Sequence, residues 1–202
     1  MLSAAQASQF PADRGAEIAF AGRSNAGKSS AINVLTQQRR LAFASKTPGR
    51  TQHINLFELG PKLAADALFA DLPGYGYAAV ERNAKLRWQE VMAEYLAVRR
   101  SLSAIVLLVD SRLGFTDIDR KLLDFVATRL ANGSVKLLAL LTKVDKLNKR
   151  DTAIALQAAS DVLAEVASEE SDVSLTAFSS LSRVGVDDAA RVLYAWAHRG
   201  AS

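Results

Sequence analysis

The sequence of 202 residues contains no cysteine and only two histidines. Disulfide bonds, thiolate nucleophiles and cysteine-ligated zinc are therefore excluded, and a metal site built from histidine is not expected. The longest apolar runs, residues 103–109 and 135–141, are too short to cross a bilayer. The first residues also lack the basic region and apolar core of a secretory signal. We therefore expect a cytoplasmic protein with no membrane span and no disulfide-linked partner.

The composition is that of an ordinary globular protein, with half of the residues hydrophobic and 23% charged. The formal net charge of +4 permits a polyanionic partner such as nucleic acid but does not require one. Residues 1–16 are small and polar, and we interpret them as an irregular lead-in. Residues 17–202 have the length of a single domain.

Strand-like and helix-like segments alternate along this domain. Strands are predicted at residues 17–22, 53–59, 67–71, 104–110, 135–142 and 173–179. Helices are predicted at residues 28–36, 81–100, 116–131, 149–168 and 186–199. Buried strands that alternate with helices favour an α/β fold, in which helices cover both faces of a mostly parallel sheet. Ligands of such folds bind at the carboxyl ends of the strands, so functional motifs are expected there.

A glycine-rich motif separates the first predicted strand from the first predicted helix. It fits the phosphate-binding pattern G-x-x-x-x-G-K-[ST] in the required strand–helix context. In this pattern the glycines let backbone N–H groups point at phosphate oxygens, the lysine reaches the β- and γ-phosphates, and the serine hydroxyl binds magnesium. The alternative is a glycine-rich turn with an exposed lysine. The predicted phosphate-binding residues are Gly22, Arg23, Ser24, Asn25, Ala26, Gly27, Lys28 and Ser29.

Three further motifs follow predicted strands. The first, Asp71-Leu72-Pro73-Gly74, places an aspartate where it can hold magnesium through water, although the same residues also suit an ordinary turn. The second is Thr142-Lys143-Val144-Asp145. A carboxylate at Asp145 can accept hydrogen bonds from N1–H and the 2-amino group of guanine, whereas adenine offers no such pair of donors. The third, Phe178-Ser179-Ser180, could contribute main-chain N–H groups beside the base.

The basic segment 37–52 is predicted to be a loop, because Pro48 and Gly49 interrupt it. A threonine in such a loop can complete the coordination of magnesium when the γ-phosphate is present. Thr47 and Thr51 are both chemically able to do so, and their order in the chain does not decide between them.

Five stretches together resemble the EngB family (also called YihA or YsxC) of bacterial ribosome-biogenesis GTPases, which belong to the translation-factor-like class of P-loop GTPases. They are GRSNAGKSS (22–30), SKTPGRTQHINLF (45–57), DLPGYGYA (71–78), TKVD (142–145) and FSS (178–180). The resemblance extends from about residue 17 to the C-terminus. Ala26 stands where these proteins commonly have valine, which is a conservative difference.

The resemblance implies a Ras-like P-loop GTPase fold and assigns the remaining roles. Magnesium would be bound by Ser29 and Thr51, with Asp71 acting through water. The first switch would comprise Gly49, Arg50, Thr51, Gln52 and His53, and Asp71 to Gly74 would open the second. The resemblance also implies GTP and GDP as ligands, the large ribosomal subunit and its RNA as partner, and a need for the protein in normal cell division and septation. The protein is expected to act as a monomer.

Tyr75 occupies the position after the D-x-x-G motif, where many switch GTPases carry a glutamine that orients the attacking water. A phenol is a poor base at neutral pH, so we expect slow intrinsic hydrolysis. Asn25 is a candidate potassium ligand, because related GTPases bind potassium through an asparagine at this position. Its alternative role is to tolerate an unusual backbone conformation in the loop.

Surface residues suggest how RNA could be contacted. The candidates for binding phosphates are Arg39, Arg40, Lys46, Arg50, Lys85, Arg87, Arg99, Arg100, Lys146, Lys149 and Arg150, and those for stacking on bases are Tyr75, Tyr77 and Trp88. Solvated surface charge and core packing are the alternatives, and His53 and His198 are expected to be structural.

Two functions therefore compete, a GTP-driven assembly factor for the ribosome and a protein-interaction switch in cell division without RNA contact. An ATP-using enzyme is disfavoured by Asp145.

Overall fold

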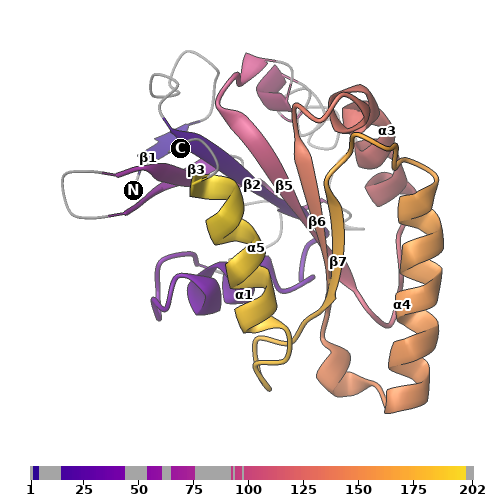
Figure 1. The fold of residues 1–202 in the computed structure, drawn as a ribbon. Helices are drawn as coiled ribbons and strands as arrows, with labels where there is room; N and C mark the ends of the chain where they lie inside the picture. Colours follow the sequence, from indigo (N-terminus) through magenta and orange to yellow (C-terminus); the bar gives the residue numbers. More distant parts are fainter. Residues whose placement is uncertain are drawn as a thin grey trace, which may run out of the picture.

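The computed structural model describes residues 2–4, 15–43, 54–60, 65–75, 92, 94–96 and 98–198 (Figure 1). Within these residues, seven strands form one sheet in the order β1-β3-β4-β2-β5-β6-β7. The strands are β1 (Leu2–Ala4), β2 (Ala16–Gly22), β3 (Ile54–Leu59), β4 (Ala67–Asp71), β5 (Leu102–Asp110), β6 (Lys136–Thr142) and β7 (Val173–Ala177). Strands β4, β2, β5, β6 and β7 are parallel, whereas β3 pairs antiparallel with both β1 and β4.

Helices cover both faces of the sheet and make three layers. They are α1 (Lys28–Leu35), α3 (Asp117–Ala131), α4 (Lys149–Ala164) and α5 (Val186–His198), with a short 3₁₀ turn η2 (Val144–Lys146) before α4. Figure 1 shows α1 and α5 on one face and α3 and α4 on the other. A hydrophobic core lies on each face of the sheet, and alternate residues of β5 pack into one or the other. Val106 packs into the core beneath α5, and Leu107 packs into the core beneath α3 and α4. The α/β fold predicted from the alternation of strands and helices, a mostly parallel sheet covered on both faces, is therefore confirmed.

Side chains cap two of these helices at their first residues. Thr116 and Asp119 form a capping box at the start of α3, because each side chain bonds the other's backbone N–H. Asn148 caps α4 by accepting a hydrogen bond of 2.9 Å from the Asp151 N–H. Helix α1 begins instead after Gly27, with no side-chain cap. Its first N–H groups are thus left without a side-chain acceptor at the sheet edge where ligands are expected.

The element boundaries agree with the sequence predictions except at a few positions. The lead-in was predicted to be irregular, yet it contains β1, which pairs with β3 at the sheet edge with Leu2 opposite Leu56. Helix α4 ends at Ala164 and not at residue 168, because the chain turns tightly after Leu163. Of the helix predicted at 81–100, Met92, Tyr95 and Leu96 are helical and buried, and residue 88 lies outside the described residues.

A buried polar cluster joins the amino ends of β2 and β5. Glu17 is fully buried and accepts hydrogen bonds from the Tyr95 hydroxyl, the Arg99 guanidinium and the Ser101 hydroxyl. The Arg99 Nε–Glu17 Oε2 distance is 2.9 Å. Arg99 is 4% exposed, so the expectation that it contacts RNA is wrong. Its charge is instead balanced inside the protein.

Among the described residues, no helix is long and apolar enough to cross a membrane.

Candidate functional site

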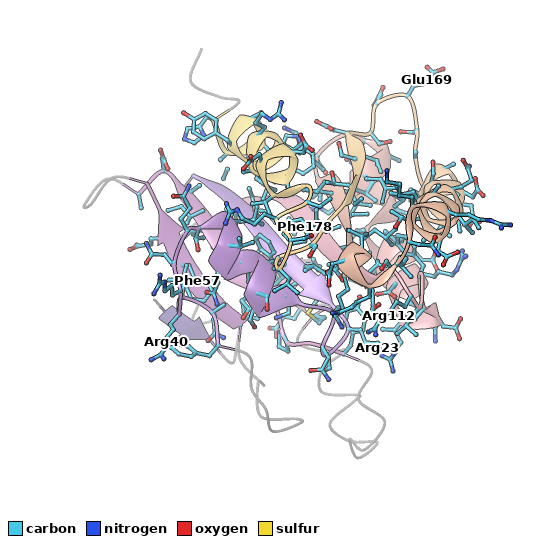
Figure 2. All side chains as sticks on the ribbon, turned by 90° about the horizontal axis from the view of Figure 1, so that it is seen from below. Arg23, Arg40, Phe57, Arg112, Glu169 and Phe178 are labelled. Carbon is cyan, nitrogen blue, oxygen red and sulfur yellow. The ribbon has the colours of Figure 1, made fainter. Side chains whose placement is uncertain are left out.

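The predicted site residues converge at the carboxyl ends of the parallel strands. Residues 22–29, 71–74, 142–145 and 178–180 all follow, or end, strands β2, β4, β6 and β7. Figure 2 views the molecule from below, with Arg23, Arg112 and Phe178 labelled in the loops at this edge. Several predicted residues lie outside the described part of the chain. They are Gly49, Arg50, Thr51, Gln52 and His53 in the expected first switch, together with Lys46, Thr47, Tyr77, Lys85, Arg87 and Trp88.

The glycine-rich loop is curled by its backbone conformation. Gly22 lies so close to β5 that a Cβ atom there would be 2.8 Å from the Leu108 carbonyl oxygen. Asn25 and Gly27 have left-handed φ values of 67° and 96°. The role of Asn25 as a residue that tolerates an unusual backbone is therefore confirmed. These two residues turn the chain directly before α1, as a loop that surrounds an anion requires.

An ion pair joins the first two motifs. The Lys28 ammonium contacts a carboxylate oxygen of Asp71, and both side chains are largely buried, with exposed fractions of 11% and 4%. The Asp71 side chain comes from the last residue of β4, two strands away in the chain but adjacent to β2 in the sheet. This arrangement places the cation expected to bind phosphate beside the acid expected to act on magnesium.

Tyr75 holds the second motif against the glycine-rich loop. Its carbonyl accepts a hydrogen bond of 2.7 Å from the Ser24 N–H, while its side chain, 4% exposed, donates its hydroxyl proton to Asp119 of α3. Burial, the Asp119 charge and this hydrogen bond raise the pKa of the Tyr75 phenol further above its ordinary value. Tyr75 is thus directed towards α3, so the prediction that it stacks on bases is wrong.

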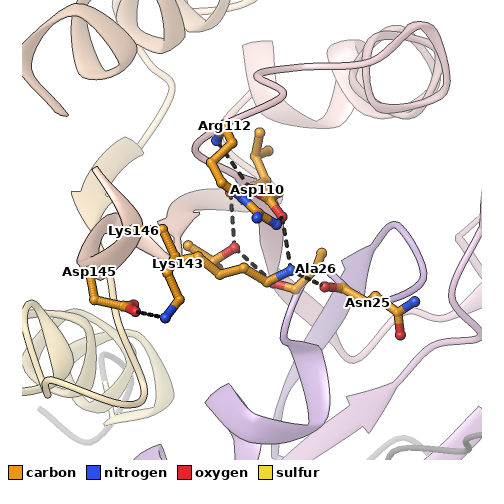
Figure 3. Close-up of polar contacts among 9 residues, drawn as sticks. Asn25, Ala26, Asp110, Arg112, Lys143, Asp145 and Lys146 are labelled. Atoms are coloured by element: carbon orange, nitrogen blue, oxygen red, sulfur yellow. Dashed lines mark hydrogen bonds and ion pairs between the residues drawn. The ribbon is translucent and has the colours of Figure 1, made fainter. Parts of the chain in front are cut away.

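The third motif is tied to the glycine-rich loop by two side chains. The Thr142 hydroxyl donates to the Ala26 carbonyl at 2.7 Å, and Lys143 Nζ donates to the Asn25 carbonyl at 2.6 Å. Figure 3 shows Lys143 reaching across to Asn25. These contacts join residues more than a hundred positions apart in the chain. They set the distance between the phosphate-binding loop and the loop that carries Asp145.

Asp145 is held in one orientation by its neighbours. Its Oδ1 accepts a hydrogen bond of 2.6 Å from the Ser179 hydroxyl, and its Oδ2 lies 3.4 Å from Lys146 Nζ. The Ser179 hydrogen bond is the main cause that lowers the pKa of Asp145, with Lys146 adding to it against the effect of burial. The carboxylate is therefore ionised at neutral pH, as an acceptor of two hydrogen bonds must be.

The fourth motif acts mainly through Ser179. Its hydroxyl orients Asp145 and accepts hydrogen bonds from the Leu181 and Ser182 N–H groups at 3.2 and 3.1 Å. Phe178 is 1% exposed and packs in the core, and its N–H donates to Leu141. The Ser179 N–H likewise donates within the protein, to Val184. The N–H groups of Phe178 and Ser179 are therefore already engaged within the protein.

One site residue was missed from the sequence. Asp110 ends β5, and its carboxylate accepts hydrogen bonds from Arg112 Nε at 3.0 Å and from Lys143 Nζ at 2.8 Å. Burial alone would raise the pKa of Asp110, but the hydrogen bonds from Arg112 and Lys143 outweigh it and lower the pKa well below its usual range. The signal was present, because an aspartate that ends a buried strand is the same feature that identified Asp71.

The structure describes several more of the residues predicted to bind RNA phosphates, and their exposure can be compared with that prediction. Five of the remaining RNA candidates are exposed, namely Arg39, Arg40, Arg100, Lys149 and Arg150, and the Lys146 side chain is 56% exposed. His198 bonds the Tyr194 carbonyl at 2.8 Å and Asp66 Oδ2 at 3.2 Å, so its structural role is confirmed. The contact with Asp66 links α5 to the segment before β4.

Known proteins share both the sequence and the fold of this chain. A family model described as "50S ribosome-binding GTPase" matches residues 17–143. A probable GTP-binding protein EngB of Acidovorax ebreus is 55% identical over 198 residues, covering 98% of this chain and 87% of that protein. The corresponding protein of a Polaromonas species is 58% identical over 182 residues, covering 90% of this chain and 71% of that protein.

Solved structures agree at the level of the fold. The crystal structure of a probable GTP-binding protein engB has a TM-score of 0.68 and 19% identity, and the match covers 91% of this chain and all of that one. The structure of Era in complex with MgGDPNP and nucleotides 1506–1542 of 16S ribosomal RNA has a TM-score of 0.67 and 17% identity, covering 91% of this chain and 57% of Era. From the sequence identity, the family match and the P-loop architecture together, this chain belongs to the EngB family of GTP-binding proteins, within the ribosome-binding GTPases.

Proposed function

We propose that this protein binds GTP and GDP at the carboxyl ends of β2, β4, β6 and β7 and hydrolyses GTP slowly. The observation that carries the proposal is the pair of contacts from Thr142 and Lys143 to the Ala26 and Asn25 carbonyls. They hold the phosphate-binding loop and the loop that carries Asp145 in one fixed arrangement, so that a single nucleotide can contact both. Residues 22–29 would bind the phosphates, and residues 49–53 would form the first switch.

Guanine specificity would come from Asp145, whose carboxylate is ionised and oriented by Ser179. An ionised carboxylate accepts from N1–H and the 2-amino group of guanine but finds no donor pair on adenine. Val144 and the Lys143 stem would pack beside the base, and Phe178, Ser179 and Ser180 would complete this side of the pocket. ATP should therefore bind much more weakly than GTP.

The residues present suit magnesium, because the Ser29 hydroxyl and the Asp71 carboxylate are the oxygen donors that this ion prefers. The Lys28–Asp71 ion pair keeps that carboxylate beside the phosphate-binding loop. Ser29 and Thr51 would bind the ion directly and Asp71 through water. Magnesium would supply neutralisation of the charge on the β- and γ-phosphates.

Slow hydrolysis follows from Tyr75, which bonds Asp119 and is not available to orient water. Potassium is proposed to stimulate turnover through Asn25, whose side chain is exposed in the glycine-rich loop. The test compares turnover in potassium and sodium buffers for the parent protein and Asn25→Ala. Equal rates in the two buffers, or a potassium effect that survives in Asn25→Ala, would exclude this role.

The base-reading proposal is tested by the change Asp145→Asn. Xanthine carries a carbonyl oxygen where guanine has its 2-amino group, so an asparagine amide can donate to it. We expect Asp145→Asn to lose GDP affinity and gain XDP affinity in calorimetric titrations. The charge-matched control is Asp124→Asn, at an exposed position in α3. An unchanged preference for GDP in Asp145→Asn would overturn the proposed site.

At the cellular level, we propose that the GTP-bound monomer acts in the cytoplasm as an assembly factor of the large ribosomal subunit. The family description, 50S ribosome-binding GTPase, supports the contact with that subunit. Normal cell division and septation would depend on it. Exposed basic side chains such as Arg39 and Arg40 would contact RNA phosphates, which makes binding sensitive to salt. The alternative is a GTP-dependent protein-interaction switch in cell division without RNA contact.

Co-sedimentation separates these two functions. Ribosomal subunits are pelleted with the protein and a GTP analogue, GDP or no nucleotide, beside Asp145→Ala. The assembly-factor proposal expects pelleting with large subunits in the GTP analogue, loss at high salt, and loss in Asp145→Ala. Failure to pellet with any subunit under all three nucleotide conditions would favour the switch without RNA contact.

A further inference from the structure

Lys143 has an unusual backbone and two anchors for its side chain. Its φ is 61°, in the left-handed region that is uncommon for residues with a side chain. Such a conformation is unfavourable and persists only where surrounding contacts compensate for it. The ammonium makes two such contacts, donating to the Asn25 carbonyl at 2.6 Å and to Asp110 Oδ2 at 2.8 Å. The orientation of Lys143 therefore depends on what holds Asp110.

Asp110 is fixed in place by several donors. Its Oδ1 accepts from the Arg112 N–H at 3.1 Å and from Arg112 Nε at 3.0 Å. Its Oδ2 accepts from an Arg112 terminal nitrogen at 2.8 Å, in addition to Lys143. The side chain is only 8% exposed, and it comes from the last residue of the central strand β5. Both oxygens are engaged within the protein, so this carboxylate is not free to bind a nucleotide or a metal ion.

From these contacts we infer that Asp110 is a positioning residue for guanine recognition. It holds Lys143 in place. Through Lys143 it fixes the position of the loop that carries Asp145 relative to the glycine-rich loop (Figure 3). Asp110 belongs to β5, a rigid element between β2 and β6 that supplied none of the predicted site residues. The inference rests on the proposed function, because it concerns how the same nucleotide site is aligned.

The first experiment measures GDP and IDP affinity in Asp110→Asn. Inosine keeps N1–H but lacks the 2-amino group, so the ratio of the two affinities reports how well Asp145 makes its second hydrogen bond. A hydrogen bond to a charged group is worth about 1.5–3 kcal/mol, so we expect GDP affinity to fall about 10- to 100-fold. IDP affinity should fall less, and the GDP-to-IDP ratio should shrink. A purely structural defect would weaken both nucleotides equally.

The second experiment asks whether Asp110 acts through Lys143. The change Lys143→Met removes the ammonium but keeps an unbranched stem to pack beside the base. We expect Lys143→Met to reduce the GDP-to-IDP ratio as Asp110→Asn does, and we expect Asp110→Asn to cause no further loss in the Lys143→Met background. Asp124→Asn in α3 is the control for the loss of one negative charge and should bind like the parent protein.

Three results would overturn this inference. They are parent-like GDP affinity and ratio in Asp110→Asn, full additivity of the two changes, and parent-like binding by Lys143→Met. The last result decides the matter even where Asp110→Asn does not fold. The Asp145→Asn titration with XDP keeps the two proposals apart. If Asp145→Asn gains XDP affinity while Asp110→Asn binds normally, the nucleotide site stands and only the positioning role fails.

Discussion

The hydroxyl of Thr142 provides the sharpest test of how the nucleotide site is built. Thr142 is 3% exposed and donates to the carbonyl of Ala26, which is equally buried, at 2.7 Å. The change Thr142→Val replaces the hydroxyl with a methyl group of similar size. The Ala26 carbonyl then loses this donor, and a buried acceptor left without a partner costs about 1–3 kcal/mol.

Two measurements follow from that value. The free energy of unfolding should fall by about 1–2 kcal/mol, which for a chain of this size lowers the melting temperature by about 2–8 °C. The phosphate-binding loop also loses a tether, so GDP affinity should fall about 5- to 30-fold. Urea denaturation and calorimetric titration with GDP measure the two effects separately.

The matched control is Thr142→Ser, which keeps the hydroxyl and removes only a buried methyl group. Removal of a methyl group from a core costs about 0.5–1.5 kcal/mol, so its stability loss should be comparable to that of Thr142→Val. Its GDP affinity, in contrast, should stay near the parent value. The reasoning is refuted if Thr142→Val binds GDP normally, or if Thr142→Ser loses as much affinity as Thr142→Val.

Three further predictions concern stability. Glu17→Gln breaks the buried ion pair with Arg99 and should lower the free energy of unfolding by about 3–5 kcal/mol in urea denaturation; a change below about 1 kcal/mol would contradict it. Gly185→Ala should lower the free energy of unfolding by at least about 2 kcal/mol in the same assay, because φ is 70° and a Cβ would lie 2.0 Å from the Ala177 carbonyl oxygen; parent-like stability would contradict it. Asp110 has a lowered pKa in the folded state, so its stabilising contribution is present above its unfolded pKa, near 4, and is lost as the pH falls through the folded value. The difference in unfolding free energy between the parent protein and Asp110→Asn should therefore shrink below about pH 4, and a constant difference down to pH 2 would contradict this.

Most of the fold was predictable because its signals are local. Continuous apolar runs such as those of β5 and β6 are characteristic of central parallel strands, and the structure confirms both within two residues. The strand β1 was missed because three residues that pair at a sheet edge carry no periodic pattern of their own. The end of α4 was predicted too far along the chain, since helical propensity continues past the residue where the chain turns.

The direction of individual side chains was less predictable. Tyr75 follows a recognisable motif, but only packing against α3 directs its hydroxyl to Asp119 and away from the glycine-rich loop. Arg99 looked like one more surface cation, yet Glu17, 82 positions earlier, pairs with it in the interior. A sequence pattern indicates which residues are charged, but not which charges find partners far away in the chain.

The sequence alone was sufficient to identify the family and the four motifs, because phosphate and guanine recognition require particular residue types at short spacings. The tertiary structure was needed to find Asp110, whose carboxylate orients Lys143. It was also needed to join Thr142 to Ala26, 116 positions apart in the chain. The physical reason is that a motif depends on local backbone geometry, whereas alignment between motifs depends on hydrogen bonds that form only when the strands are placed side by side in one sheet.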